Sequence, residues 1–331
     1  MAMTLNDMKV GMSDKIAQQV VDIFVRESEI LELLPFDNCV AAGGVGSTLT
    51  YGYLRKKLPS TADFRALGAE YTASEATMEK ATVDLKIFGG KYTMDRVLKS
   101  AEGQYNNEAY QMEEKIKAAV SLFNWNLIQG DTDTATNGFN GLSELLTGGS
   151  TEYGASSKID LSTATNVKNN AGDFYDALML LIADTNADAI LVNKLMKAKI
   201  NAVARALGYQ TQTEEAFGRK ITTIDGVRII DMGNHYTVAS GAAVANACVP
   251  AGLTRTIGSA STTGLSDIYA VRFDANDGLC GVTLSGNTGL SIYRPDWTAP
   301  GAVKSGEVEL VANIALKNAS AAGVLRNIKL A

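Results

Sequence analysis

The first region of the chain has apolar residues at helical spacing. Ile16, Val20 and Phe24 recur at intervals of four between Ser13 and Pro35, so they share one face of an amphipathic helix. Serine is a good N-terminal cap and proline cannot continue a helix, which predicts that the helix begins after Ser13 and ends before Pro35. The next segment, CVAAGGVGS, is rich in glycine, and we expect it to be a flexible link.

Two segments further along alternate between apolar residues and polar or small ones. Tyr51 and Tyr53 alternate in STLTYGYL, and Val83 and Leu85 alternate in TVDLKI, which predicts two half-buried strands. The polar stretch between them has no period of its own. At ~3.3 Å per residue such a strand pair projects about 40 Å, well beyond a body with a radius of gyration of about 20 Å. A lone hairpin is only marginally stable in water, so this extension needs a partner.

A helical period returns between Gln104 and Gln129, where Met112, Ile116 and Phe123 follow one another at intervals of four and seven residues. This pattern predicts one long helix, a rod of roughly 39 Å. We expect Gly130 to end it, because glycine is favoured just past the last helical turn. A loop rich in glycine, threonine and serine follows.

The part from about Asp160 to Asp296 mixes helical and strand patterns in a compact α/β arrangement. DFYDALMLLIADT and KLMKAKINAVARALG have helical spacing, DAILVN is a buried strand, and Asp225-Gly226 predicts a tight turn between ITTI and VRII. DIYAVRF, LCGVTL and LSIYRPD predict further strands. The weakly patterned stretch from Ala239 to Gly264 is predicted to be a surface loop. GEVELVANIALKN and AGVLRNIKLA predict two closing strands.

Composition limits the available chemistry. The 331 residues are 46% apolar and 20% charged, as expected for a globular protein. The net charge of −6 argues against tight, sequence-independent binding of nucleic acid. With one histidine, His235, and three scattered cysteines, no CxxC plus HxxxH zinc site can form, and a Ser-His-Asp triad would have to use His235. We therefore expect no enzyme, no metal and no cofactor.

The cysteine count and the hydropathy pattern bear on the cellular compartment. An odd number of dispersed cysteines indicates a reducing compartment without a disulfide framework. No apolar run reaches the ~18 residues of a membrane span, and the polar start has no signal-peptide pattern. We expect a protein made in a cytoplasm, with no membrane partner.

Several short motifs have simpler interpretations than a functional site. The glycines of 43–46 lack the strand-turn-helix context of a dinucleotide-binding turn, so a hinge is favoured. Asp131 and Asp133 suggest a calcium loop, but the positions that follow lack the required ligands, and a solvated turn is favoured. His235 is expected in a turn, and Trp125 as a packing group on the long helix.

The projecting parts are predicted to be covered by neighbouring copies of the chain. The extended loop has a basic part followed by an acidic part, which favours charge-complementary docking on an adjacent subunit. The alternative is a solvated surface, because exposed ion pairs contribute little individually. The predicted inter-subunit contact residues are Ile16, Val20, Phe24, Tyr51, Tyr53, Arg55, Lys56, Lys57, Arg65, Glu75 and Glu79.

The order of these elements resembles the major capsid proteins of tailed phages, which have the α+β Hong Kong 97-type fold. The resemblance is carried by the loop strands TYGYLRKKLPSTADFRALG and KATVDLKIFGGKYTMDR, and by the helix QYNNEAYQMEEKIKAAVSLFNWNLIQG. It continues in ILVNKLMKAKINAVARALG, GVRIIDMGN and the closing VELVANIALKNASAAGVLRNIKLA. The resemblance covers nearly the whole chain. It lies in the order of the elements and in their residue patterns, without a short signature motif.

The resemblance implies a division into five parts. These are an N-terminal arm (1–46), an extended loop (47–94), a peripheral domain with a spine helix (95–159), an axial domain (160–296) and C-terminal strands that return to the peripheral domain (297–331).

It also implies a shell of hexamers and pentamers that encloses double-stranded DNA without binding specific sequences, located in the virion and assembled in the cytoplasm of a bacterial host. A separate scaffolding protein, a portal and decoration proteins are candidate partners. The alternatives are an encapsulin-type nanocompartment shell and, less favoured, a soluble α/β enzyme.

Overall fold

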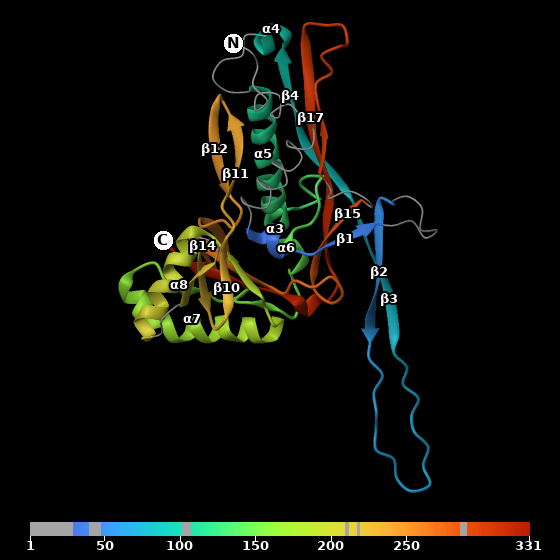
Figure 1. Cartoon of the computed structure of the whole chain (residues 1–331). Coiled ribbons are helices and arrows are strands. Elements are labelled where there is room, and N and C mark those ends of the chain that lie inside the picture. Colours follow the sequence, from blue (N-terminus) through green and yellow to red (C-terminus); the bar gives the residue numbers. More distant parts are fainter. Residues whose placement is uncertain (1–28, 40–47, 101–106, 209–211, 217–218, 285–289) are drawn as a thin grey trace.

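The computed structural model describes residues 29–39, 48–100, 107–208, 212–216, 219–284 and 290–331. Its architecture is mixed α and β, as predicted. Figure 1 shows an elongated part around helix α5 (Asn107–Gln129) and a compact part that carries helices α7 (Ala164–Thr185) and α8 (Lys194–Leu207). A hairpin of β2 (Thr50–Leu58) and β3 (Thr77–Asp84) projects away from both.

Within the described residues, five strands form a sheet that runs along the elongated part, here called the long sheet. Its longest strand, β17, pairs antiparallel with β4 over ten residue pairs. This pairing requires glycine at position 89, because a Cβ there would lie 1.9 Å from the carbonyl oxygen of Val308. The strands are β1 (Phe36–Cys39), β4 (Lys86–Asp95), β15 (Leu279–Leu284), β16 (Leu290–Tyr293) and β17 (Val303–Leu316).

Helix α5 packs its apolar face against the long sheet, and its sequence prediction is confirmed from residue 107 onwards; residues 104–106 lie outside the described part. Phe123 is fully buried, 6.1 Å from the ring of Phe88 and 6.0 Å from that of Phe139. The helix ends before Gly130, where a Cβ would lie 2.1 Å from the Phe139 carbonyl oxygen. The short helices nearby are α3 (Glu29–Leu33), α4 (Arg96–Ser100) and α6 (Leu142–Leu145).

The compact part contains a second sheet, here called the broad sheet, with α7 and α8 packed against it. Thr163 caps α7 and Asn193 caps α8 through their side-chain oxygens. Gly208 ends α8 at φ 78°, and this helix end is the one that the sequence predicted. The described strands are β5 (Glu152–Tyr153), β6 (Ile159–Asp160), β7 (Ala189–Val192), β8 (Gln212–Ala216), β9 (Arg219–Ile224), β10 (Val227–Asp231), β13 (Leu253–Ile257), β14 (Ala260–Val271) and β18 (Ala322–Lys329). A 3-10 turn, Ala319–Ala321, precedes β18.

The prediction of a surface loop from Ala239 to Gly264 is wrong. The region contains β12 (Ala242–Ala247), β13 and part of β14, and β12 forms a hairpin with β11 (Asn234–Ala239). The alternation is hidden because the outward side chains are mostly alanine, serine and threonine, which hydropathy hardly distinguishes. Ser240 and Gly241 form the tight turn between β11 and β12. Their φ angles are 52° and 78°, as a two-residue hairpin turn requires.

Strand partners also differ from the sequence expectation. LCGVTL and LSIYRPD were expected within the axial range, but the strands that they form, β15 and β16, pair with β17 in the long sheet. The closing strand β18 pairs instead with β14 in the broad sheet. β15 is buried along nearly its whole length, so its pattern predicts a strand without indicating which sheet receives it.

The range 47–94 expected for the extended loop has two structural roles. Its first part forms the β2–β3 hairpin and the irregular residues 59–76 that connect the strands. Its last part, β4, is a member of the long sheet. The projecting unit is therefore 50–84, and β4 ties it to the body.

Candidate assembly surfaces

The base of the β2–β3 hairpin is fixed to the body by Tyr51 and Tyr53. The Tyr51 hydroxyl donates to Oδ2 of Asp37 at 2.5 Å, and Nζ of Lys317 donates to the Tyr51 oxygen at 2.6 Å. The Tyr53 hydroxyl donates to the carbonyl oxygen of Leu316 at 3.0 Å. These two predicted contact residues thus contact their own chain, where they set the direction in which the hairpin leaves the body.

The protonation states at this base follow from its contacts. Burial alone raises the pKa of Asp37, but hydrogen bonds from Tyr51 and the Asn38 N–H, with the charge of Lys317, lower it overall. Burial and the hydrogen bond to Asp37 raise the pKa of Tyr51. Burial lowers the pKa of Lys317, but the hydrogen bonds to Tyr51 and Asp37, together with the charge interactions with Cys280 and Tyr51, raise it overall. At neutral pH a neutral phenol therefore bridges a carboxylate and an ammonium group.

The arms of the hairpin carry the predicted charged residues. Arg55 and Glu79 face each other in the strand register and form an ion pair through Nε and Oε1. Lys56 and Lys57, further out on β2, are exposed, and so is Glu75 beyond the start of β3. Because Arg55 and Glu79 pair with each other, Lys56, Lys57 and Glu75 are the charges of this group available to another molecule.

The outer segment of the hairpin, residues 59–76, exposes large apolar side chains. Phe64 and Leu67 are 107% and 104% exposed, as in an extended peptide. Between them Arg65 lies over the ring of Tyr71 at 5.4 Å and donates to the carbonyl oxygen of Ala69 at 3.1 Å. In a single copy nothing in the described chain covers Phe64 and Leu67, which is unfavourable in water.

The predicted contact residues of the arm, Ile16, Val20 and Phe24, lie outside the described residues, as do the glycines of 43–46.

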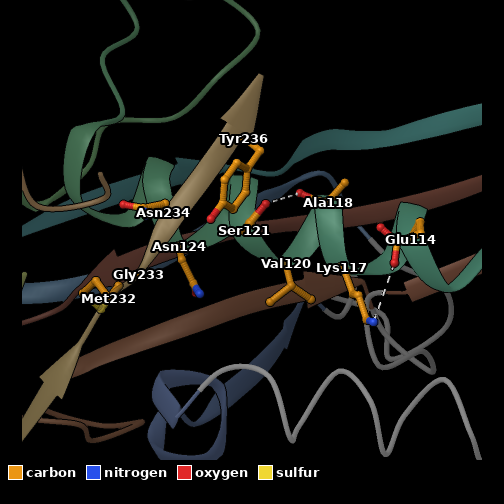
Figure 2. Close-up of a pocket in the computed structure, with 10 residues that line it drawn as sticks. All are labelled: Glu114, Lys117, Ala118, Val120, Ser121, Asn124, Met232, Gly233, Asn234 and Tyr236. Atoms are coloured by element: carbon orange, nitrogen blue, oxygen red, sulfur yellow. Dashed lines mark hydrogen bonds and ion pairs between the residues drawn. The ribbon is translucent and has the colours of Figure 1, made fainter. Parts of the chain in front are cut away.

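A pocket of about 430 Å³ lies where β11 begins beside α5. Figure 2 shows residues of its lining, among them the apolar Val120 and Met232 and the polar Ser121, Asn124 and Tyr236. Sequence reasoning missed this pocket because its two sides, α5 and the start of β11, are far apart along the chain. Within the described residues, the hydroxyl of its lining that contacts an imidazole is that of Ser121, which lies 3.2 Å from Nδ1 of His235.

His235 is on strand β11 and not in the turn that was predicted. Ser121 donates its hydroxyl hydrogen to the Ala118 carbonyl at 2.9 Å, and its oxygen lies 3.2 Å from Nδ1 of His235. Which group donates in this contact is set by the tautomer of the imidazole ring. Burial lowers the pKa of His235, and its ring lies 6.2 Å from that of Trp125. The histidine thus helps to hold β11 against α5.

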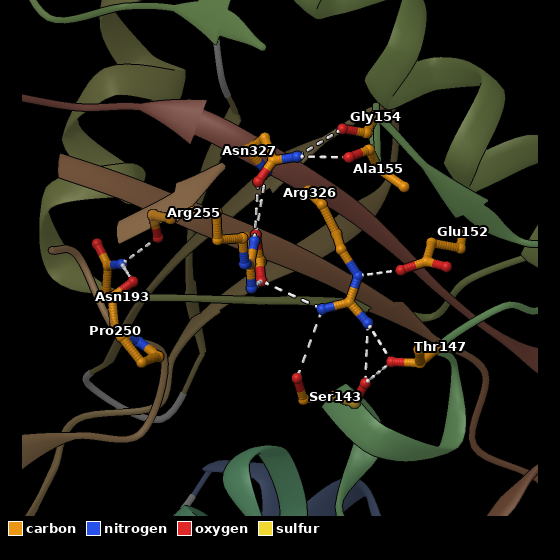
Figure 3. A network of polar contacts seen from close by, with 12 residues as sticks. Ser143, Thr147, Glu152, Gly154, Ala155, Asn193, Pro250, Arg255, Arg326 and Asn327 are labelled. Atoms are coloured by element: carbon orange, nitrogen blue, oxygen red, sulfur yellow. Dashed lines mark hydrogen bonds and ion pairs between the residues drawn. The ribbon is translucent and has the colours of Figure 1, made fainter. Parts of the chain in front are cut away.

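A buried polar network joins the broad sheet to the turn after α6, as Figure 3 shows. Asp267, 1% exposed, accepts two bonds of 2.6 Å from Arg255. Arg326 donates to the Ser143 carbonyl at 2.8 Å and to the Thr147 hydroxyl at 2.9 Å, and also pairs with Glu152.

Asn327, at φ 62°, completes the network. Its amide donates to the Gly154 and Ala155 carbonyls at 2.9 and 3.0 Å. No sequence motif announces these residues, which are far apart along the chain. The network fixes how the elongated and compact parts meet.

The described part of the chain has no cluster of side chains that could hold a metal ion. No three His, Cys, Asp or Glu side chains come together there, and the calcium loop considered at Asp131 is a turn in which that carboxylate accepts from Asp133 and Thr134. The cysteines are free and buried, and burial raises the pKa of Cys248 to about 12 and of Cys280 to about 11. Among the described helices, none is long and apolar enough to cross a membrane.

No protein-family model matches the chain, and no curated protein does so. Solved structures do match over nearly its full length. A chain of the holo-SrpI encapsulin complex from Synechococcus elongatus PCC 7942 has a TM-score of 0.60 at 15% identity, covering 91% of this chain and 87% of that one. A chain of Mycobacterium phage Bobi has a TM-score of 0.56 at 10% identity, covering 91% and 90%.

A third match is to the capsid of the native GTA particle, with a TM-score of 0.52 at 10% identity and coverage of 92% and 90%. At these identities the matches establish the fold. The chain has the Hong Kong 97-type fold, as its element order indicated.

Proposed function

We propose that this chain is the major capsid protein of a tailed double-stranded DNA phage, which self-assembles as hexamers and pentamers into the icosahedral head shell. The carrying observation is the β2–β3 hairpin, which projects from the body and leaves Phe64 and Leu67 bare. Such a projection is explained when another copy covers it. The fold shared with a phage chain and a GTA capsid chain supports the proposal.

In this proposal the parts of the chain have separate roles. The arm (1–46) and the extended loop (47–94) reach adjacent subunits. The elongated part, with α5 and the long sheet that contains β15, β16 and β17, forms the periphery of each capsomer. The compact part, with the broad sheet that contains β18, surrounds its symmetry axis. Ile16, Val20 and Phe24 contribute apolar contacts, and the loop residues contribute charge.

The loop charges divide into two kinds. Arg55 and Glu79 stiffen the hairpin, Arg65 shapes its outer segment, and Tyr51 and Tyr53 hold its base. Lys56, Lys57 and Glu75 are the groups that dock on the neighbouring copy, where charge sets register and partner choice more than affinity.

The particle would enclose DNA without reading its sequence, in keeping with an acidic subunit. Its role is structural and not catalytic. We place it in the virion, assembled in the cytoplasm of a bacterial host, with a separate scaffolding protein, a portal and decoration proteins as candidate partners.

The second candidate is an encapsulin-type nanocompartment, favoured by the TM-score of 0.60 to an encapsulin chain. The contents of particles purified from the cells that naturally make the chain distinguish the two. Nuclease-resistant double-stranded DNA inside them supports the capsid, whereas a protein cargo without DNA supports the nanocompartment. A small oligomer that forms no particle contradicts both.

A further inference from the structure

The β11–β12 hairpin has an exposed strand edge that lacks the usual protection. Among the described residues, β12 pairs with β11 alone, and it is β11 that packs on α5. Figure 1 shows β12 on the far side of β11 from the helix. Proteins usually protect such an edge with charge, proline or a bulge. The register of this hairpin is continuous, so no bulge protects it.

Charge is absent from the whole region. Between Asp231 and Arg255 the sequence contains no Asp, Glu, Lys or Arg, although 20% of the chain is charged. Val238, Val244 and Tyr236 are nonetheless 79%, 41% and 61% exposed. A surface with neither sign of charge can meet a copy of itself without repulsion.

The hydrogen-bond pattern identifies which groups face outward. The Cys248 N–H donates to the Gly233 carbonyl at 3.1 Å, which makes these residues a hydrogen-bonded pair. Bonded pairs recur at every second position of an antiparallel ladder. On β12, Ala242, Val244 and Asn246 therefore point their N–H and C=O groups to β11, and the alternating alanines point theirs outward. The outward alanines are Ala243, Ala245 and Ala247.

We infer that β12 pairs antiparallel with β12 of a second copy about a two-fold axis. In this register Ala245 lies opposite Ala245 of the second copy, and Ala243 lies opposite Ala247 of the second copy. All the outward N–H and C=O groups of β12 are then hydrogen-bonded. Alanine side chains offer no steric obstacle to this approach. The inference rests on the proposed function, because a shell supplies neighbouring copies in fixed positions.

Disulfide trapping tests this register. Opposed bonded residues have Cα atoms about 5.5 Å apart, within the range that a disulfide spans. An Ala245→Cys chain treated with the thiol oxidant diamide is expected to yield a covalent dimer on a non-reducing gel. Val238→Cys, also exposed but on β11, is the matched control and is expected to stay monomeric, as is the parent chain with its buried cysteines.

Two outcomes without a covalent dimer would contradict the inference, and the reactivity of the introduced thiol tells them apart. If the Ala245→Cys chain stays monomeric and its introduced thiol reacts freely with a maleimide, the edge is bare and the inference is wrong. If the chain stays monomeric but the introduced thiol is protected from maleimide, another segment or another protein covers the edge, and the inference is again wrong.

Ala245→Pro supplies a second measurement, because it removes an outward N–H without breaking the ladder to β11. We expect it to lower the fraction of chain in particles by about tenfold near the assembly threshold, corresponding to about 1.4 kcal/mol per contact. Ala245→Val keeps the N–H and is expected to assemble like the parent. Unchanged assembly of the proline variant, with the hairpin intact by circular dichroism, contradicts the inference.

These experiments separate the inference from the proposed function. Electron microscopy of the parent chain decides whether particles form. If none form but concentrated Ala245→Cys chain is trapped as a dimer, the edge pairing stands and the shell does not. If particles form and no dimer is trapped, the shell stands and the edge pairing does not.

Discussion

The β2–β3 and β11–β12 hairpins both leave the body, but they present different chemistry to solvent. The first carries charged side chains along its arms and bare aromatic and aliphatic groups at its outer end. The second has no charge and presents backbone groups of alanine. Side-chain charge selects a partner and depends on salt, whereas an edge of backbone groups selects only another strand. The two hairpins are thus suited to two different kinds of recognition.

The largest effect is expected from removing the outer segment of the β2–β3 hairpin. Replacement of residues 59–76 by a short Gly-Ser turn removes the exposed Phe64 and Leu67 and the reach to a neighbour. We expect particle formation to be lost, as judged by negative-stain microscopy. The thermal unfolding of the rest should change little, because the outer segment lies away from the body.

A same-length variant, Phe64→Ser with Leu67→Ser, controls for the shortened chain. It should also assemble poorly if the apolar groups are what the neighbour covers. Normal particles from both variants would show that this hairpin is a solvated surface.

The next effect concerns the free lysines of β2. Charge reversal at Lys56 and Lys57 is expected to lower the particle yield by about tenfold at low salt, and by less at high salt where charges are screened. The matched control reverses two exposed lysines of the compact part, Lys158 and Lys168, and should leave the yield near that of the parent. Equal yields for both pairs would favour the solvated alternative.

A smaller effect is expected at the base of the hairpin. Tyr51→Phe removes the hydroxyl that bridges Asp37 and Lys317, which should cost about 1 kcal/mol of unfolding free energy at neutral pH by urea titration. Tyr236→Phe, at an exposed tyrosine, is the control and should change stability little. A fully stable Tyr51→Phe chain would show that the bridge does not hold the hairpin.

The same base predicts a pH dependence. The pKa of Asp37 is lowered in the folded chain, so its contribution is present above its ordinary value and is lost as the pH falls through the lowered one. Asp37→Asn should therefore lose less stability than the parent as the pH falls below 3.8, the ordinary pKa of an aspartate. Parallel stability curves for the two chains would contradict the assignment.

The smallest effect is expected at the turn of the uncharged hairpin. Gly241→Ala places a Cβ on a residue at φ 78°, with an expected cost of about 1 kcal/mol. Gly252→Ala, where φ is not positive and a Cβ meets open space, should be close to neutral. Thermal unfolding measures both, and equal melting temperatures would argue against the tight turn.

Elements with strong local periodicity could be predicted from the sequence. The helix through Ile116 and Phe123, the capped end at Gly208 and the Asp225-Gly226 hairpin each depend on spacing or on a turn residue. What could not be predicted depends on long-range partners. β15 is apolar on both faces and fits either sheet, and the alanine-rich β12 has too little contrast for its alternation to be detected.

The candidate surfaces divide in the same way. The sequence indicates that the 47–94 region projects, but not that Tyr51 and Tyr53 bind their own chain through Asp37 and Leu316, which are distant in sequence. It also cannot indicate that Nη1 of Arg326 lies 3.5 Å from Oδ2 of Asp267, because buried ion pairs follow from the packing of sheets and leave no local pattern.

The central claim is that this chain is completed only by other copies of itself. The most direct test is the mass of the purified full-length chain in solution, by analytical ultracentrifugation over a range of concentrations and with microscopy of the fastest fraction. The account predicts closed particles of megadalton mass in equilibrium with capsomers. A stable monomer or small oligomer at every concentration, folded by circular dichroism, would contradict it.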